Sequence, residues 1–325
     1  MLPSPASIAA ACLPAAPPAC ARPTAASRSS RRWAPSRTRR VELFRYETRI
    51  LGRLPPAPYR PGLLATYDRD GWAALLLEHV EGRHPDLGAT LDHRAAANLV
   101  AAQVAELTAP PAADATPLAE SARRWARRWS TIAADPAGYL PAWAAARTDE
   151  MLARARRLPD RLPAQTLCHF DVRDDNPLVR PDGTAAILDW GMARLGPSWA
   201  DPLLLALQNS TDTTVRVVST LTPTEHEAAV DLITALAGSQ AWNARQPAPP
   251  GLPHLPAFCA DDATRLRAAA KALSSPQPPL PDCPRRTLPG APGPGRTPCG
   301  PLTRRLLTPR NQAAPSAEAE PYGSS

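Results

Sequence analysis

Residues 168–176 read Cys-His-Phe-Asp-Val-Arg-Asp-Asp-Asn, and residues 187–191 read Ile-Leu-Asp-Trp-Gly. A short apolar run leads into each segment, which predicts a strand that ends in a polar loop. A Pro-Asp-Gly sequence lies between the two segments and is a strong turn signal. We therefore expect a tight hairpin that brings the side chains of Asp171, Asn176 and Asp189 close together at one of its ends.

Three oxygen-bearing side chains at one place suit phosphoryl transfer. The transition state carries spread negative charge, so the protein mainly positions the reactants and holds metal. Asp171 is the candidate that orients an attacking hydroxyl and accepts its proton, while Asn176 and Asp189 offer the hard oxygen ligands that Mg²⁺ prefers. The alternative is structural: Asp171 belongs to a solvated acidic loop, and Asn176 and Asp189 are turn residues that bond local backbone.

The pattern His-x-Asp-x-x-x-x-Asn, followed by an apolar strand and Asp-Trp-Gly, resembles the aminoglycoside phosphotransferase family, which has a protein-kinase-like fold. The resemblance implies a kinase that moves the γ-phosphate of ATP to a hydroxyl of a small molecule. It implies Asp171 as catalytic base and Asn176 and Asp189 as Mg²⁺ ligands. It also implies that His169 and Asp201 support the catalytic loop.

The resemblance covers about residues 41–270 and is weaker toward the N-terminus. Glu47 lies where the glutamate of the regulatory helix would be, with an ordinary helix-surface glutamate as the alternative. The sequence Leu-Glu-His-Val-Glu-Gly resembles the strand and hinge that hold adenine, which places Glu78, His79 and Val80 at the nucleotide. We expect backbone groups there, and not the Glu78 side chain, to make the contact.

Three residues of the motif region also have structural interpretations. His169 is expected to be a buried structural histidine and not a catalyst. Asp201 is expected to cap a helix first, with support of the loop as its second role. Arg173 either contacts phosphate or faces solvent, and the sequence does not decide between the two.

The chain departs from the family pattern near its start. Kinases of this kind have a glycine-rich loop over the phosphates and a lysine that pairs with the helix glutamate. This sequence has no glycine before Gly52, and its one lysine is Lys271. Arg37, Arg39 or Arg40 is a candidate replacement, but arginine and lysine are not interchangeable at a tight site. We therefore predict weak or absent kinase activity.

Composition divides the chain into four parts. Residues 1–40 are rich in Ala, Pro, Ser and Arg, and residues 274–325 are rich in Pro, Gly and Arg. Both segments lack periodicity and are expected to be disordered. Translation of GC-rich DNA in a shifted reading frame would give such a composition, which is our hypothesis for both segments. Residues 41–88 are expected to be the remnant of a small nucleotide-binding lobe with its hinge, and residues 89–273 a helical catalytic lobe. The expected fold class is α+β: a two-lobed, protein-kinase-like fold with a truncated small lobe, whose large lobe carries the catalytic β-hairpin.

Periodicity and turn chemistry predict individual elements within residues 41–273. Helices are expected at 41–54, 90–108, 119–134, from 136, at 203–210 and at 222–240, and strands at 63–67, 73–80, 165–168, 178–179 and 185–188.

Charge and cysteine content exclude several classes of protein. The net charge is +7, but the arginines are scattered and do not alternate with aromatics in a stripe, so solvated helix faces are favoured over nucleic-acid binding. The six cysteines show no zinc spacing or disulfide framework, and no apolar run is long enough to span a membrane; both fit a cytoplasmic protein. The expected partners are therefore ATP and a small hydroxyl compound. The alternatives are a pseudokinase-like or degraded family member and, on charge alone, an arginine-rich nucleic-acid binder.

Overall fold

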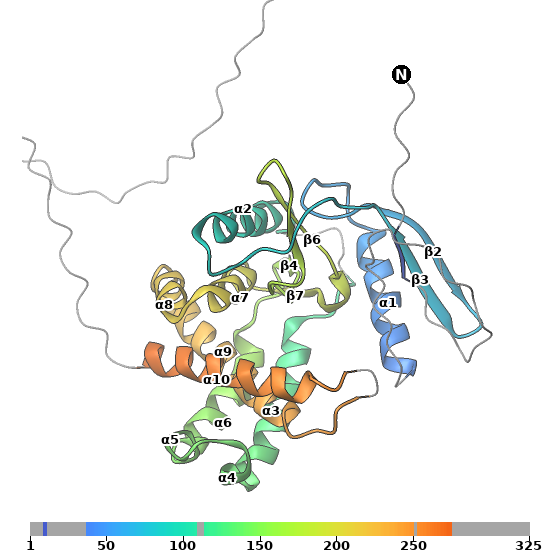
Figure 1. Cartoon of the computed structure of the whole chain (residues 1–325). Helices are drawn as coiled ribbons and strands as arrows, with labels where there is room; N and C mark the ends of the chain where they lie inside the picture. Colours follow the sequence, from blue (N-terminus) through green and yellow to red (C-terminus); the bar gives the residue numbers. More distant parts are fainter. Residues whose placement is uncertain (1–8, 12–36, 109–113, 250–251, 275–325) are drawn as a thin grey trace, which may run out of the picture. The chain divides into compact units, whose positions relative to one another are not determined.

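The computed structural model describes residues 9–11, 37–108, 114–249 and 252–274 (Figure 1). The chain divides into two compact units, Met1–Pro278 and Pro279–Ser325, and every described residue lies in the first. Helices dominate this unit and small antiparallel sheets complete it, so the fold is of the α+β class that the sequence predicts.

The elements have the following bounds. The helices are α1 (Arg37–Leu51), α2 (Thr90–Glu106), α3 (Leu118–Ala134), α4 (Pro136–Tyr139), α5 (Ala142–Ala145), α6 (Thr148–Arg157), α7 (Ala200–Asn209), α8 (Thr211–Ser219), α9 (Pro223–Asn243) and α10 (Leu255–Ser274), with the 3₁₀ turns η1 (Leu158–Arg161) and η2 (Trp190–Met192). The strands are β1 (Ala9–Ala11), β2 (Leu63–Arg69), β3 (Trp72–Leu77), β4 (Thr166–Cys168), β5 (Pro177–Val179), β6 (Ala185–Ile187) and β7 (Arg194–Gly196).

Strands β2 and β3 form the first hairpin, which the sequence predicts. Asp70 and Gly71 connect the strands with φ angles of 55° and 77°, and positive φ at both central residues is the requirement of a type I′ turn. Strand β1 adds to the other edge of β3, giving the order β1-β3-β2. The prediction of disorder for residues 1–40 is therefore wrong at residues 9–11, which form a strand, and at residues 37–40, which begin α1. The rest of that segment, and residues 275–325, lie outside the described residues.

The second hairpin carries the motif region. Strands β5 and β6 pair antiparallel, and Gly183, with φ at 81°, provides the predicted turn between them. The flanking strands β4 and β7 pair with each other, from Thr166 opposite Gly196 to Cys168 opposite Arg194. Strand β7 is too short for its period to be read in the sequence.

Helices α3, α6, α9 and α10 pack together around the first hydrophobic core (Figure 1). Trp129 is its largest fully buried side chain, and the indole N–H donates to the carbonyl of Thr234 at 3.1 Å. Gly238 lies against the indole so closely that a Cβ there would overlap the ring. The second core lies among α1, α2, β3 and β6, with Trp190 fully buried in it.

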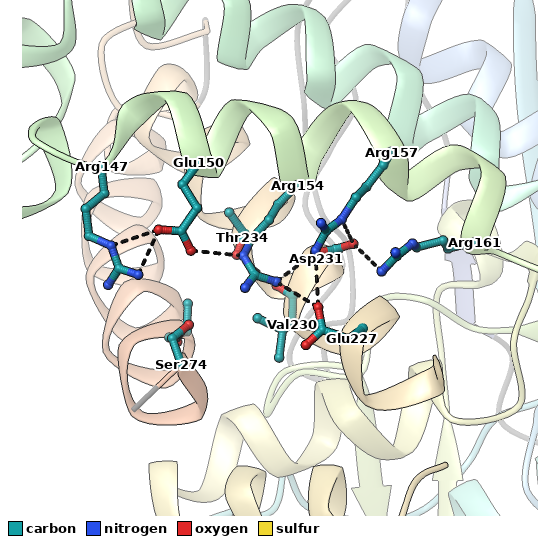
Figure 2. Close-up of polar contacts among 11 residues, drawn as sticks. Arg147, Glu150, Arg154, Arg157, Arg161, Glu227, Val230, Asp231, Thr234 and Ser274 are labelled. Carbon is teal, nitrogen blue, oxygen red and sulfur yellow. Dashed lines mark hydrogen bonds and ion pairs between the residues drawn. The ribbon is translucent and has the colours of Figure 1, made fainter. Parts of the chain in front are cut away.

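A buried ion-pair cluster joins α6 and η1 to α9 (Figure 2). Asp231 on α9 is 0 % exposed, and its carboxylate accepts hydrogen bonds from Arg154, Arg157 and Arg161 at 2.7–3.2 Å. Arg157 contributes two of these bonds, to the two carboxylate oxygens. Glu227, one turn earlier on α9, pairs with Arg157 at 3.2 Å. The cluster therefore fixes how α6 lies on α9.

No helix in the described ranges is both long enough and apolar enough to cross a membrane.

Candidate active site

Asp201 organises the backbone of the loop that follows β4. Its side chain is 0 % exposed, and its carboxylate accepts the amide hydrogens of His169 at 2.6 Å and Phe170 at 2.9 Å. A third hydrogen bond, at 2.6 Å, comes from the side-chain amide of Gln103 on α2. Burial raises the pKa of Asp201, while these bonds favour the ionised form. Phe170 takes a φ of 60°, a left-handed conformation that is unusual for a residue with a side chain.

The predicted capping role of Asp201 is wrong. Helix α7 begins one residue earlier, at Ala200, with Trp199 at the N-cap position and no side-chain cap. Asp201 therefore lies inside the first turn, where its carboxylate faces the loop backbone instead of the helix amides.

His169 links the two loops of the motif region. The imidazole is fully buried, its Nε2 lies 2.9 Å from the carbonyl oxygen of Leu188, and its Nδ1 accepts the amide hydrogen of Asp171 at 3.3 Å. These partners require the neutral tautomer with the proton on Nε2, and burial lowers the pKa of His169 in agreement. The ring also packs edge-on against Trp190, with the ring centroids 5.0 Å apart.

Asp171 and Asn176 lie together at the end of this loop. The Asn176 side chain, 1 % exposed, donates to both the backbone carbonyl of Asp171, at 2.7 Å, and its carboxylate Oδ2, at 3.0 Å. The Nε of Arg173 lies 3.2 Å from the other carboxylate oxygen, and Arg173 also pairs with Asp175 at 3.0 Å. Burial raises the pKa of Asp171, and Arg173 opposes that rise. The guanidinium is stacked on Phe258 of α10, 5.2 Å from the ring centre.

Asp189 follows β6 in a left-handed conformation with φ at 65°. Its negative charge acts on Asp171, whose pKa it helps to raise. Gly191 faces the Asp189 carboxylate, where a Cβ would lie 3.3 Å from Oδ1. The next amide, of Trp190, donates to Glu47 Oε1 on α1 at 3.0 Å. Glu47 is 6 % exposed; burial first, and then the Asp189 charge, raise its pKa to about 8.

Comparison with known proteins identifies the family. The profile described as "Phosphotransferase enzyme family" matches residues 26–220, more than half of the chain. The chain belongs to this family. No curated protein sequence matches it.

Solved structures share the fold of this phosphotransferase at low sequence identity. The choline kinase LicA from Streptococcus pneumoniae is 12 % identical, with 73 % of this chain and 84 % of that chain covered at a TM-score of 0.50. An aminoglycoside phosphotransferase from Alicyclobacillus acidocaldarius is 16 % identical, covering 74 % and 83 %, at 0.43. The macrolide 2'-phosphotransferase MphH from Brachybacterium faecium is 16 % identical, covering 74 % and 80 %, at 0.40. The match to the choline kinase, together with the family match, confirms the kinase-like fold expected from the motif.

The segment predicted as the hinge follows β3 in this phosphotransferase. The amide of Glu78 donates to the carbonyl of Gly62 at 2.8 Å, and its carboxylate accepts from the Gly62 amide at 3.2 Å. Among the described residues, the backbone groups of residues 79–81, which include His79 and Val80, form no hydrogen bond with other backbone. Gly82 lies against β5, where a Cβ would be 2.8 Å from the carbonyl oxygen of Val179.

Among the described residues, Glu47 has no cationic partner. Within the described part of the chain no arginine, lysine or histidine lies within ion-pair distance of Glu47. Lys271 is on α10, where its ammonium lies 5.3 Å from the Trp143 ring centre. The side chains of the candidate replacements, Arg37, Arg39 and Arg40, lie outside the described residues.

Sequence reasoning missed Gln103 and left Arg173 undecided. Gln103 is 0 % exposed and reaches Asp201 from 98 residues away in the chain. Its only sequence signal is an amide on the apolar face of a helix, which many surface helices also show. Arg173 contacts Asp171 and Asp175, so it does not simply face solvent.

Proposed function

We propose that this chain is a phosphotransferase that moves the γ-phosphate of ATP to a hydroxyl of a small molecule. Family membership supports the reaction class. The observation that carries the proposal is the hydrogen bond from the buried Asn176 side chain to the partly buried Asp171 carboxylate, on which the charge of Asp189 also acts. A carboxylate held by an amide, beside a second carboxylate, suits both proton transfer and phosphate-bound metal.

Asp171 is proposed as the base. The substrate oxygen attacks the γ-phosphorus, a new O–P bond forms, the bond from phosphorus to the ADP oxygen breaks, and the hydroxyl proton passes to the Asp171 carboxylate. The Asn176 side chain donates a hydrogen bond to Oδ2 of the Asp171 carboxylate at 3.0 Å. This bond would fix which lone pairs of the carboxylate face the substrate. Because burial raises the pKa of Asp171, it is a stronger base than an exposed aspartate.

Asn176 and Asp189 fit a magnesium ion. The Asn176 side-chain nitrogen donates two hydrogen bonds to Asp171, and the side-chain oxygen Oδ1 accepts none from a described residue. The Asp189 carboxylate likewise accepts no hydrogen bond from any residue in the described ranges. Two hard oxygen ligands suit Mg²⁺, which keeps several waters and binds substrate phosphates. When bound, the ion would neutralise charge on the phosphates of ATP.

His169 and Asp201 are proposed to support the loop, and Arg173 to orient Asp171. The neutral His169 ties the Asp171 amide to the carbonyl before Asp189, so it sets the distance between the two loops. Asp201 holds the start of the same loop through two amides. Arg173 places a positive charge 3.2 Å from Asp171, where it would also attract the phosphate oxygens.

The nucleotide is proposed to lie along the hinge. The backbone groups of residues 79–81, which have no backbone partner among the described residues, would supply the donor and acceptor that an adenine edge needs. They lie next to Glu78, whose own amide donates to Gly62. Residues 41–88 would then form the small lobe and hinge, and residues 89–273 the catalytic lobe. Glu47 would lie near the phosphates of ATP, because its carboxyl accepts the amide hydrogen of Trp190, the residue after Asp189.

A second candidate function is nucleotide binding without turnover. The observation that favours it is Glu47, which is buried without a cationic partner in the described part of the chain and has its pKa raised to about 8. A carboxyl that holds its proton at neutral pH cannot position a lysine or arginine by charge. This candidate keeps the Asn176 and Asp189 pair and predicts a very low rate.

Thermal melting with ATP tests both. Because a ligand that binds only the folded state raises the melting temperature, Mg²⁺ with ATP should stabilise the protein by about 3 kcal/mol at a hundredfold excess over Kd. Asp189→Ala should abolish the Mg²⁺-dependent part, whereas Asp182→Ala, at the exposed tip of the same hairpin, should keep it. ADP release with a panel of hydroxyl compounds, lost in Asp171→Asn, supports the first function; binding without release supports the second. No shift with Mg²⁺ and ATP contradicts both.

A further inference from the structure

A cavity that none of the proposed catalytic residues lines lies between the α4–α5 segment and the helices α9 and α10. Its volume is about 460 Å³. That size falls in the range of sites for small organic molecules. Its walls are largely apolar, with Leu140, Ala241 and Ala263 among the lining residues, and Tyr139 adds an aromatic face.

Two arginines from different elements reach this cavity. Arg267 comes from α10 and Arg245 from just beyond the end of α9. No aspartate or glutamate is among the lining residues, all of which belong to the described part of the chain. The cavity is therefore apolar and positively charged at the same time.

Arg267 is half-buried, and no described residue supplies a counter-charge to it. Its Nη2 donates to the hydroxyl of Thr264 at 3.0 Å, which also lines the cavity. Neither Arg267 nor Arg245 forms an ion pair with a described residue, whereas Arg265 of the same helix pairs with Asp262. Burial lowers the pKa of Arg267, and no carboxylate opposes that effect. A desolvated cation without a partner is costly, and a bound anion would remove the cost.

We propose that this cavity binds a small organic anion, a carboxylate or phosphate monoester attached to an apolar or aromatic body. A guanidinium presents donors in a planar fork that matches the oxygens of either group. The anionic group would lie between Arg267 and Arg245, with the body against Leu140 and Tyr139. An inorganic anion would satisfy the charge but leave the apolar walls uncovered.

This site does not depend on the proposed phosphoryl transfer. None of Asp171, Asn176 and Asp189 lines the cavity. Helix α10 contacts both places, since Phe258 near its start stacks with Arg173, while Arg267 lies further along it. A ligand in the cavity would therefore touch the helix on which Arg173 packs.

Isothermal titration of the full chain with phenyl phosphate tests the proposal. The titration is made in EDTA and repeated with Asp189→Ala, so that binding at the proposed metal site is excluded. We expect saturable binding that Arg267→Met weakens about tenfold, as loss of one charge-assisted hydrogen-bonded partner would. Arg94→Met, which removes an exposed arginine on α2, should leave it unchanged.

Three outcomes would overturn the proposal: no saturable binding of phenyl phosphate at millimolar concentration, equal binding by Arg267→Met, or inorganic phosphate binding as tightly as phenyl phosphate. Melting temperatures of the variants without ligand show whether each variant still folds. Arg267→Met should melt at the same or a higher temperature than the parent, because it removes an unpaired, half-buried charge. Arg245→Met changes an exposed residue and should weaken phenyl phosphate without altering the melting temperature.

Discussion

Asp201 is a single carboxylate that holds three donors from two separate elements. The donors are the amides of His169 and Phe170 and the side chain of Gln103. Replacement by asparagine keeps the shape but turns one acceptor into an N–H group that faces these donors. We expect Asp201→Asn to lower the free energy of unfolding by about 2–3 kcal/mol, since a hydrogen bond to a buried charge is lost and a donor is left unpaired.

Urea unfolding measures this loss, with Asp212→Asn, an exposed aspartate of α8, as the matched control. If Asp201 positions the loop that carries Asp171, Asp201→Asn should lower the rate of ADP release with a hydroxyl substrate more than it lowers the affinity for that substrate. A stability equal to that of the control would show that Asp201 does not support the loop.

Glu47 makes stability depend on pH. Its carboxyl has a pKa of about 8 in the folded protein against an ordinary 4.5, because burial and the neighbouring Asp189 disfavour its charge. Between these values the unfolded chain releases the proton while the folded chain keeps it. Stability attributable to Glu47 is therefore full below about pH 4.5 and falls by about 1.4 kcal/mol per pH unit up to about pH 8.

Glu47→Gln should remove this dependence, because glutamine has no proton to release and still accepts the Trp190 amide. The variant should lie within about 1 kcal/mol of the parent near pH 5 and exceed it by roughly 3–5 kcal/mol at pH 8. Urea unfolding across pH 5–8, with EDTA present, measures the difference. Glu42→Gln, an exposed glutamate on the same helix, serves as the control. Parallel pH profiles for the parent and Glu47→Gln would contradict the prediction.

At the scale of elements, local chemistry made the two hairpins predictable. Asp70–Gly71 and Gly183 occupy positions of positive φ that their residue types favour, and the flanking apolar runs have the period of strands. Helix α9 begins with a capping box of Thr222 and Glu225, close to its predicted start at 222. Such signals act within a few residues, so one sequence is enough to read them.

Contacts between distant elements were not predictable in the same way. The pairing of β4 with β7 joins Thr166 to Gly196, and Gln103 meets Asp201 across 98 residues. Capping, predicted for Asp201 from its place before Pro202, is a local interaction; the structure uses the carboxylate for a long-range one instead. A single sequence does not indicate whether a buried carboxylate will accept hydrogen bonds from its own helix or from a distant loop.

The Asp231 cluster is the clearest of these long-range contacts, and it decides how α6 lies on α9 (Figure 2). Asp231→Asn would remove the buried charge that Arg154, Arg157 and Arg161 share, while these arginines themselves are partly exposed. Breaking a buried pair by removing one partner typically costs about 3–5 kcal/mol. Denaturant unfolding should show that loss, and Glu227→Gln, at a side chain 50 % exposed, should cost less than about 1 kcal/mol. Equal effects of the two variants would mean that burial does not decide the strength of the cluster.

At the scale of the whole unit, α7 joins the two hydrophobic cores. Leu203 and Leu207 belong to the core of α3, α6, α9 and α10, while Leu205 belongs to the core around Trp190. Asp201, in the first turn of the same helix, adds polar bonds to α2 and to the loop that follows β4. Separation of the cores would expose apolar surface on α7 and break these bonds together, so we expect them to unfold as one cooperative unit.

Hydrogen exchange of Asp231→Asn tests that cooperativity, because its substitution lies in the first core only. If the cores are coupled, amides of α2 and β5, far from Asp231, should lose protection to the same extent as those of α9, and melting should stay a single transition at a temperature lower by about 6–20 °C. Glu227→Gln should leave both regions protected, since it removes only an exposed pair. Loss of protection in α9 alone would mean that the catalytic hairpin stays folded while the α3–α6–α9 core opens. In that case α7 would act as a boundary between two units, and nucleotide added to Asp231→Asn would stabilise the hairpin region without restoring α9.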